Sequence, residues 1–374
     1  MIPGARPASS ILLTAPLCRF PSSFLSSKNA ASCDYRVLML QRSSKSKFFP
    51  SSYVFPGGAV DAQDFATPYV SSSSTPFLES SSLASRPAVM QPGKNGSADA
   101  VGKKQVSADA FRVSAIRELF EESGYLYGSE IREEIGDARS KKTMDRDAVH
   151  AGSQRFAAEL AQSRKSLDLG SLFPISRWIT PFQEYDTRRF DCVFYAAPLH
   201  DEHAVADGSR CSSILDIQHD NVETVDTLWI SPAEALRRCE RGEIMLPPPT
   251  HSLLSWMDHF PRHADWKTAV ARLRPETADS PSRYFLGLPN VSEFATILPA
   301  LIAVPGAHRC DPTNKYFGVS KVLIFPGDSA YEECQKIGLE NPQHVWDSVP
   351  REGLTVHRII WRAPALYTVL RSSL

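Results

Sequence analysis

Short apolar runs separated by polar segments dominate the first part of the chain, and this pattern predicts β-strands. The first three runs are Ser9–Thr14, Tyr35–Leu40 and Tyr53–Phe55. Later runs lie at 178–181, 189–195 and 224–230, and the tail adds runs near 297–304, 320–325 and 355–362. We expect Pro56-Gly57-Gly58 to stop the third strand, because proline and glycine are the strongest local breakers.

Helical periodicity is clearest after residue 108. Phe111, Ala115 and Leu119 recur at helical spacing, and Gly124 follows at the position of a C-terminal stop. The pattern therefore predicts a helix of about four turns that starts at Ala108.

The later helices are predicted from caps and breakers. Ser231 followed by Pro232 is typical of a helix start. The charged segment 130–170 favours helices with a polar face. Pro247-Pro248-Pro249 predicts a stiff connector, which we expect to lead into one helix over roughly 251–275.

Two segments have an unusual composition. Residues 65–107 are rich in Ser, Pro and Gly and poor in apolar side chains, so we predict that most of this stretch is disordered. Residues 1–33 contain no acidic residue, which is typical of a mitochondrial presequence, but four prolines would break the required helix. We therefore favour the alternative, in which this segment supplies the first strand.

Composition and charge narrow the classes of partner. The chain has 374 residues, 42% of them apolar and 22% charged, which suits a globular core. The formal net charge of −1 gives no reason to expect nucleic acid or an anionic membrane as partner. No apolar stretch is long enough to span a bilayer. The seven cysteines include no C-x-x-C pair, which argues against a disulfide scaffold or a Cys-type zinc site.

The chemically informative segment is Arg117–Tyr125, which carries three glutamates on the predicted helix. Glu118 and Glu122 are four residues apart and share one face, and Glu121 flanks them. Carboxylates crowded near the C-terminal end of a helix repel one another and oppose its dipole. A hard divalent cation would relieve that cost. For an arbitrary segment of this composition, the alternative is a solvated acidic face.

This segment resembles the second half of the Nudix box, G-x5-E-x7-R-E-U-x-E-E-x-G-U, where U is apolar. Upstream, Phe55-Pro56-Gly57-Gly58 resembles the strand-to-loop transition of the same motif. Asp64 stands where the family usually has Glu, and Asp61 where a second acid often occurs. Residues 65–116 separate Asp64 from Arg117, where the family has seven residues. Because the cost of closing a loop grows only logarithmically with its length, the two halves can still meet in space.

An interrupted box is typical of one branch of the family, the acyl-coenzyme A diphosphatases of the Nudix hydrolase nineteen type. Segments similar to this branch are Leu38–Ser43, Thr187–Asp191, Leu246–Pro249, Leu323–Asp328 and His357–Ile360. The resemblance implies an α/β fold: a Nudix α/β/α sandwich with a mixed sheet, a disordered insertion and a C-terminal extension. It implies a Nudix domain over 8–275 and an extension over 276–374 that packs on it.

The resemblance also implies a reaction. With Mg²⁺ or Mn²⁺, such an enzyme hydrolyses the pyrophosphate of coenzyme A or acyl-coenzyme A to 3′,5′-ADP and (acyl-)4′-phosphopantetheine. The alternatives are a Nudix hydrolase of another nucleotide, such as ADP-ribose or NADH, and a catalytically silent Nudix binding scaffold. The expected partner is a small-molecule nucleotide, and the oligomeric state stays open. The tripeptide Ser372-Ser373-Leu374 loosely resembles a peroxisomal signal, so we expect an intracellular protein of the peroxisome or, alternatively, the mitochondrion.

Roles for the acidic residues follow from the same resemblance. The implied metal ligands are Glu118, Glu121 and Glu122, with Arg117 pairing to the carboxylates and orienting them. The candidate catalytic residues are Glu118, Glu121 and Glu223. Glu223 is a candidate general base or, alternatively, a surface residue at a strand edge.

The candidate substrate-binding residues are Arg42, Gly57, Gly58, Arg188 and Arg189. The glycines would let the backbone approach a ligand closely, and the planar donor fork of arginine suits phosphate. Because successive strand residues point to opposite faces, at most one of Arg188 and Arg189 faces the site. Lys45 and Lys47 are more simply interpreted as solubilising charges.

We predict that deletion of residues 70–105 changes the melting temperature little, because this segment contributes few apolar side chains to a core. Thermal unfolding of the full chain and of the deletion variant, followed by circular dichroism, checks this. A large drop would mean that the segment is packed against the fold.

Overall fold

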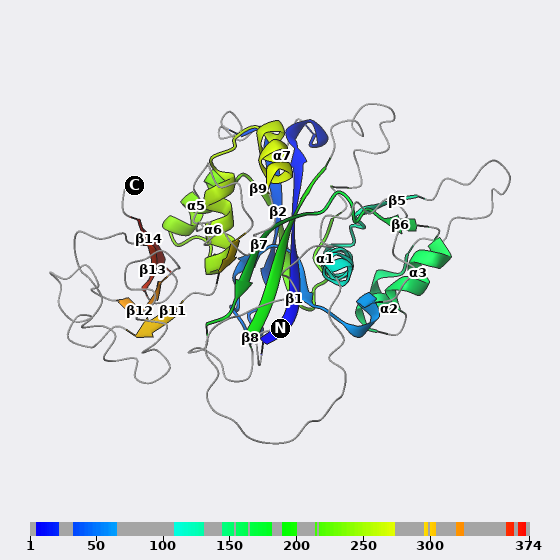
Figure 1. The fold of residues 1–374 in the computed structure, drawn as a ribbon, viewed down its shortest axis with the longest axis horizontal. Helices are drawn as coiled ribbons and strands as arrows, with labels where there is room; N and C mark the ends of the chain where they lie inside the picture. Colours follow the sequence, from blue (N-terminus) through cyan, green and yellow to red (C-terminus); the bar gives the residue numbers. More distant parts are fainter. Residues whose placement is uncertain are drawn as a thin grey trace, which may run out of the picture.

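A computed structural model describes most of the first three-quarters of the chain and five strands of the tail (Figure 1). The described residues are 5–21, 33–65, 108–130, 144–152, 155–163, 165–181, 189–199, 214, 217–273, 295–297, 300–303, 319–324, 357–362 and 366–371. Predictions for most of 65–107, for Arg188 and for the tripeptide 372–374 lie outside these residues.

The centre of the molecule is an eight-stranded mixed sheet. Its strands are β1 (Ala5–Pro16), β2 (Tyr35–Arg42), β3 (Tyr53–Val54), β4 (Gly57–Ala59), β7 (Phe173–Ile179), β8 (Arg189–Pro198), β9 (Thr224–Ile230) and β10 (Ala295–Ile297). The order is β10-β7-β8-β1-β2-β3, with β4 paired to β1 and β9 paired to β2. The strands predicted from apolar runs before residue 231 are all present, and the mixed sheet is confirmed.

The first strand, β1, is the axis of this sheet. It pairs in parallel with β8 over Ala5–Thr14, and its other edge pairs antiparallel with β4 and then with β2. Residues from Ala8 onward are all buried, because neighbours cover both edges and both faces. That position explains why the strand is a continuous apolar run, as in fully buried strands.

The segment Gly57–Ala59 is a strand that the sequence did not predict. The third strand stops before Pro56-Gly57-Gly58 as expected, with β3 ending at Val54, but the chain then forms β4 and pairs with Ala8–Ser10. The reason is steric, because a Cβ at Gly57 would lie 2.4 Å from the carbonyl oxygen of Ser9. Only glycine lets the backbones approach this closely.

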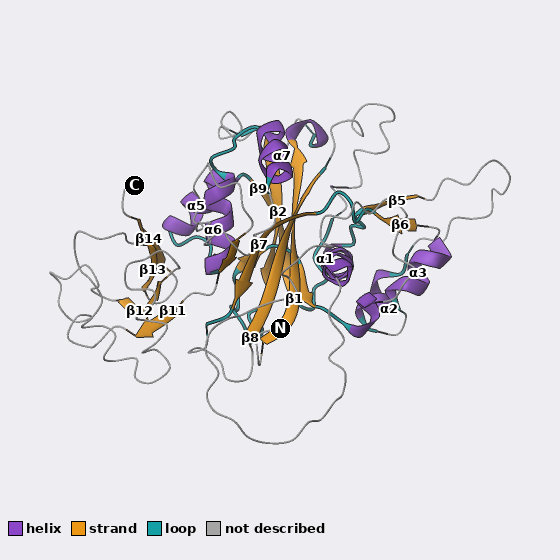
Figure 2. Ribbon diagram, in the orientation of Figure 1, coloured by secondary structure: helices purple, strands orange, loops and turns teal. Residues whose placement is uncertain are grey.

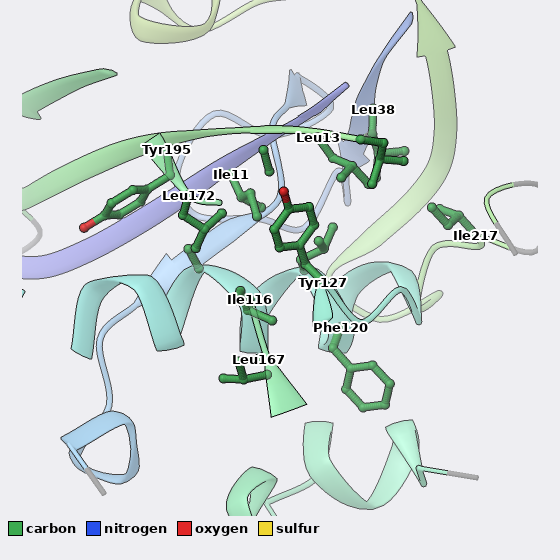
Figure 3. Packing of buried hydrophobic residues seen from close by; sticks show 14 of the residues in the cluster. Ile11, Leu13, Leu38, Ile116, Phe120, Tyr127, Leu167, Leu172, Tyr195 and Ile217 are labelled. Atoms are coloured by element: carbon green, nitrogen blue, oxygen red, sulfur yellow. The ribbon is translucent and has the colours of Figure 1, made fainter. Parts of the chain in front are cut away.

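Helices cover both faces of the sheet and divide the core in two (Figures 1 and 2). One face is covered by α1 (Ala108–Ser123), α2 (Arg146–His150) and α3 (Phe156–Ser163), and the other by α5 (Pro232–Glu240), α6 (Pro248–Met257) and α7 (His263–Arg272). Figure 3 shows the core on the α1 side, where α1 lies under the sheet residues Ile11, Leu13 and Leu38, and Phe120 points from the far side of α1 toward α3, where its ring meets Phe156. The expected α/β/α sandwich is therefore present.

The predicted ends of two helices are confirmed. Gly124, at φ +76°, follows α1, and its N–H donates to the Phe120 carbonyl at 2.8 Å. The backbone N–H of Glu234 donates to the side chain of Ser231, with Pro232 as the first residue of α5. Both ends use the capping chemistry that the sequence indicated.

The prediction of one helix over 251–275 was wrong, because the structure has α6 and α7 separated by a short connection. Pro261 lacks an N–H and its ring would clash with the carbonyl four residues earlier, so no helix continues through it. Pro248 and Pro249 belong to the first turn of α6 and not to a connector, because the first helical positions need no intrahelical N–H donor.

The segment 130–170 also differs from its prediction. Besides α2 and α3 it contains β6 (Lys165–Leu167), which pairs with β5 (Gly128–Glu130). In the tail, β11 (Ala300–Ala303), β12 (Val319–Ile324), β13 (His357–Arg362) and β14 (Leu366–Arg371) form a four-stranded antiparallel sheet. Within the described ranges, none of the helices combines the length and apolar character that crossing a membrane requires.

Candidate active site

A buried ion pair joins the two separated segments of the motif. Arg117 of α1 donates from Nε to Asp64 Oδ1 at 2.8 Å and from Nη2 to Asp64 Oδ2 at 3.0 Å. The Asp64 side chain is fully buried and that of Arg117 is 5% exposed. Asp64 sits on the 3₁₀ helix η4 (Ala62–Phe65). The interruption between residues 65 and 116 therefore does not prevent the two halves from meeting, and Asp64 takes the place of the usual Glu as partner of the arginine.

The same guanidinium orients two of the helix carboxylates. Its Nη1 donates to Glu118 Oε1 at 2.9 Å and to Glu121 Oε1 at 3.2 Å, and its Nη2 donates to the Ala59 carbonyl at 3.1 Å. Arg117 thus contacts two of the three carboxylates that the family resemblance implies it orients.

The third carboxylate is held by β4. The Gly57 N–H donates to Glu122 Oε2 at 3.0 Å. At Gly58, a Cβ would lie 2.5–2.6 Å from the carboxylate atoms of Glu118. The backbone of β4 therefore lies directly against the acidic face of α1. A side chain at Gly58 would disrupt this contact, whereas one at Gly57 would meet β1.

These carboxylates do not form a solvated acidic face. Glu118 and Glu121 have side chains that are only 13% and 12% exposed, and Glu122 is buried. Burial raises the pKa of Glu118 to about 7, against the opposing effect of Arg117. Burial and the neighbouring Glu118 raise the pKa of Glu122 well above its usual range. A cation beside them would stabilise both charged forms.

Glu223 lies near this group, on a turn before β9. The carboxylate of Asp220 accepts backbone N–H groups from Val222, Glu223 and Thr224 at 2.8–3.2 Å, and the Glu223 carbonyl accepts the N–H of Ser43 at 2.8 Å. Its negative charge contributes to the raised pKa values of Glu118 and Glu122. The side chain is exposed, so it faces solvent at the edge of the acidic group.

The candidate phosphate-binding cations occupy different environments. Arg42 lines the cavity described below and donates to Ser46 Oγ from Nε at 3.0 Å and from Nη2 at 2.7 Å. Arg189 is buried and donates from Nε and Nη2 to the Thr180 carbonyl, both at 3.1 Å. Lys45 and Lys47 are exposed. Of these cations, Arg42 is the one placed beside the carboxylates.

A cavity of about 390 Å³ opens beside the two glycines. It lies between β1, β4, β7, β8, the loop 43–52 and the start of α6, and its lining includes Arg42, Gly57, Gly58 and Glu223. Gly58 also touches Glu118. The cavity and the carboxylates are therefore adjacent, separated only by the glycine backbone.

The donor set fits a hard divalent cation. Glu118 and Glu122 present carboxylate oxygens, and their burial and mutual repulsion favour a positive charge between them. Glu121 is turned to Arg117 in this arrangement. In the part of the chain that the structure describes, no three His, Cys, Asp or Glu side chains are already grouped as a complete ligand set.

A mixed sheet between two helical layers, with these glutamates on the first helix, defines a Nudix domain. Residues 5–257 match the family model described as NUDT19 Nudix domain, and the chain belongs to this family. Divalent metals are used by Nudix hydrolases in general.

Relatives cover most of the chain. Acyl-coenzyme A diphosphatase NUDT19 of Gallus gallus is 28% identical over 399 residues, which cover 95% of this chain and 88% of the chicken protein. The human protein of that name is 26% identical over 387 residues, covering 97% and 91%. Among solved structures, a NUDIX hydrolase from Alicyclobacillus acidocaldarius has a TM-score of 0.46 at 20% identity, covering 72% of this chain and 98% of that one.

Two features of the site were not predicted from the sequence. Asp220 was not singled out, although Asp-Asn before a strand is a turn signal that could have identified it. The cavity lining was also missed, because it combines residues from seven segments that no local pattern connects.

We predict that Asp64→Ala lowers the free energy of unfolding by about 3–5 kcal/mol, because it leaves the Arg117 guanidinium buried without its main partner. Chemical denaturation measures this. Asp265→Ala is the control, since Asp265 pairs with Arg262 on the surface, where solvent screens the pair and its loss should barely change stability. Equal losses in the two variants would contradict a structural role for the buried pair.

The raised pKa of Glu118 predicts a pH dependence of stability. In metal-free protein the folded state keeps this proton up to pH about 7, whereas the unfolded chain releases it near pH 4.5. The folded state therefore binds more protons between these values, and the free energy of unfolding falls as the pH rises through this window. Denaturation of wild type and Glu118→Gln with EDTA present, at several pH values, tests it. The free energy of unfolding should fall less with rising pH in Glu118→Gln than in wild type. Parallel curves of unfolding free energy against pH would contradict a raised pKa for Glu118.

Proposed function

We propose that this protein is a metal-dependent hydrolase that cleaves the pyrophosphate of coenzyme A or acyl-coenzyme A. The products are 3′,5′-ADP and (acyl-)4′-phosphopantetheine. The observation that carries the proposal is the buried group of Glu118 and Glu122 beside Gly57 and Gly58, which Arg117 completes across an interrupted motif. The names of relatives that align over nearly the whole chain support the choice of substrate.

The metal that we propose is Mg²⁺ or Mn²⁺, held by Glu118 and Glu122 with Glu121 as a further candidate. Both ions prefer carboxylate oxygens. When bound, such an ion supplies neutralisation of phosphate charge and acidifies water. The side chains and backbone of the protein then have to position the substrate and accept the proton that the attacking water releases.

Several residues of the chain suit those tasks. Gly58 lets the β4 backbone lie against the Glu118 carboxylate, so a phosphate group at this end of the cavity lies next to the acids. Arg42 offers a positive charge at the cavity rim, on the substrate side of the carboxylates. Glu223, which Asp220 holds beside the group, is the candidate to accept a proton from the attacking water.

The burial of the glutamates disfavours a silent binding scaffold. Keeping Glu118 and Glu122 in a buried position raises their pKa values and so costs stability at neutral pH. A scaffold that only bound nucleotide could replace either residue with glutamine and gain stability. An enzyme that needs the charges cannot make that replacement.

We predict that Glu122→Gln lowers turnover of coenzyme A at least about 100-fold while the fold is kept. The glutamine oxygen can still accept the Gly57 N–H, and the buried charge is removed, so the melting temperature should not fall. Product formation with Mg²⁺, read by mass spectrometry, measures turnover.

Glu240→Gln is the matched control, because Glu240 is exposed at the end of α5. It should retain wild-type turnover. Undiminished activity in Glu122→Gln would overturn the metal site. A wild-type protein that cleaves ADP-ribose but not coenzyme A would overturn the substrate.

A further inference from the structure

The cavity beside the carboxylates has charged side chains at its open rim and none in its interior. Of the 24 residues that line it, three are charged: Arg6, Arg42 and Glu223. Arg6 and Glu223 are exposed and Arg42 is half-buried, so the charges lie at the open rim. The cavity therefore has a polar rim beside Gly58 and an interior without charged side chains.

The interior wall is continuous with the hydrophobic core on the α5–α7 side. Phe55, Trp178 and Phe194 line the cavity and belong to that core, with 3–7% of their surface exposed. Pro247, which precedes α6, and Pro248, its first residue, line the cavity too and are buried. Such a wall favours an uncharged, largely apolar ligand, since a charged group would lose its hydration there without a partner.

A second wall comes from the loop between β2 and β3. Phe48 and Phe49 line the cavity, and the Phe48 ring meets Phe49 and Phe190 edge to face, with centroids 4.6 and 5.5 Å apart and planes 78° and 63° apart. Ser52 Oγ donates to the Phe49 carbonyl at 2.7 Å, and Phe49 has a φ of +47°. This hydrogen bond holds the loop in an uncommon backbone conformation in which both phenyl rings line the cavity. Because the rings meet edge to face and are not parallel, a flat nucleotide base cannot stack between them.

We propose that this cavity binds the pantetheine arm of the substrate together with the start of any acyl group. This inference rests on the proposed function. The arm begins at the pyrophosphate, which would lie at the carboxylates next to Gly58, and it carries a gem-dimethyl group and methylenes that suit an apolar wall. The nucleotide half carries a doubly ionised 3′-phosphate, and the interior offers no cationic side chain to pair with it. Arg6 and Arg42 at the rim remain available for the phosphates.

The two halves of the substrate allow a direct test. We would measure the Kd of 4′-phosphopantetheine and of 3′,5′-ADP by calorimetry in the presence of Mg²⁺, for wild type and for Cys192→Leu. Cys192 lines the cavity between Phe190 and Phe194, so leucine there narrows it. We expect the Kd of 4′-phosphopantetheine to rise about tenfold or more and that of 3′,5′-ADP to change less than about twofold.

A second variant covers the case in which Cys192→Leu fails to fold. Phe48→Ala removes a ring of the loop wall without touching either core, and it should raise the Kd of 4′-phosphopantetheine selectively as well. The controls are Cys18→Leu and Phe65→Ala, the same substitutions at exposed positions outside the cavity. Both controls should bind the two halves as wild type does.

A selective loss of 3′,5′-ADP binding would place the nucleotide in the cavity and overturn the proposal, and so would unchanged binding of both halves. Failure of the proposed function gives a different result. Wild-type protein would then neither cleave coenzyme A nor bind either half, and the assignment of the cavity would fall with it.

Discussion

The active site depends on one buried ion pair, between Arg117 and Asp64. A guanidinium that is 5% exposed has to be paired, and a single carboxylate takes both its Nε and its Nη2. Its remaining donor reaches Glu118 and Glu121, so the position of Asp64 also decides where these glutamates lie. The single positive charge of Arg117 pairs with Asp64, Glu118 and Glu121. Glu122 instead accepts a hydrogen bond from a backbone N–H, that of Gly57. The negative potential that remains is what a divalent cation would neutralise.

The sheet also determines that the apolar cavity lies next to the carboxylates of α1. Side chains alternate along β1, so Ile11 and Leu13 pack under α1 while Leu12 packs on the α5–α7 side. The carboxylates thus belong to one face and the cavity opens on the other. The carboxylates and the cavity are adjacent at Gly58, where the absence of a side chain leaves only the backbone of β4 between them. A substrate could therefore have its pyrophosphate at the acids and extend one arm through the sheet edge into an apolar site.

Prediction from sequence succeeded where a local signal matches a local structure. The runs at 224–230 and 35–40, the cap at Ser231 and the stop at Gly124 each act within a few residues, and each was confirmed. It failed where a distant partner decides. Gly57–Ala59 is a strand only because β1 offers an edge, which no local signal in the sequence predicts.

The sequence alone determined the class of protein, since the spacing of Arg117, Glu118, Glu121 and Glu122 identifies the family and predicts which helix carries the acids. It also determined that the acids share a helix face, because 3.6 residues per turn leave no other arrangement. Only the tertiary structure decided that Asp64 completes the motif, that the acids are buried and that an apolar cavity adjoins them. Those properties arise from contacts between segments far apart in the chain, and burial, which sets the pKa of each carboxylate, is not a property of a residue's neighbours in sequence.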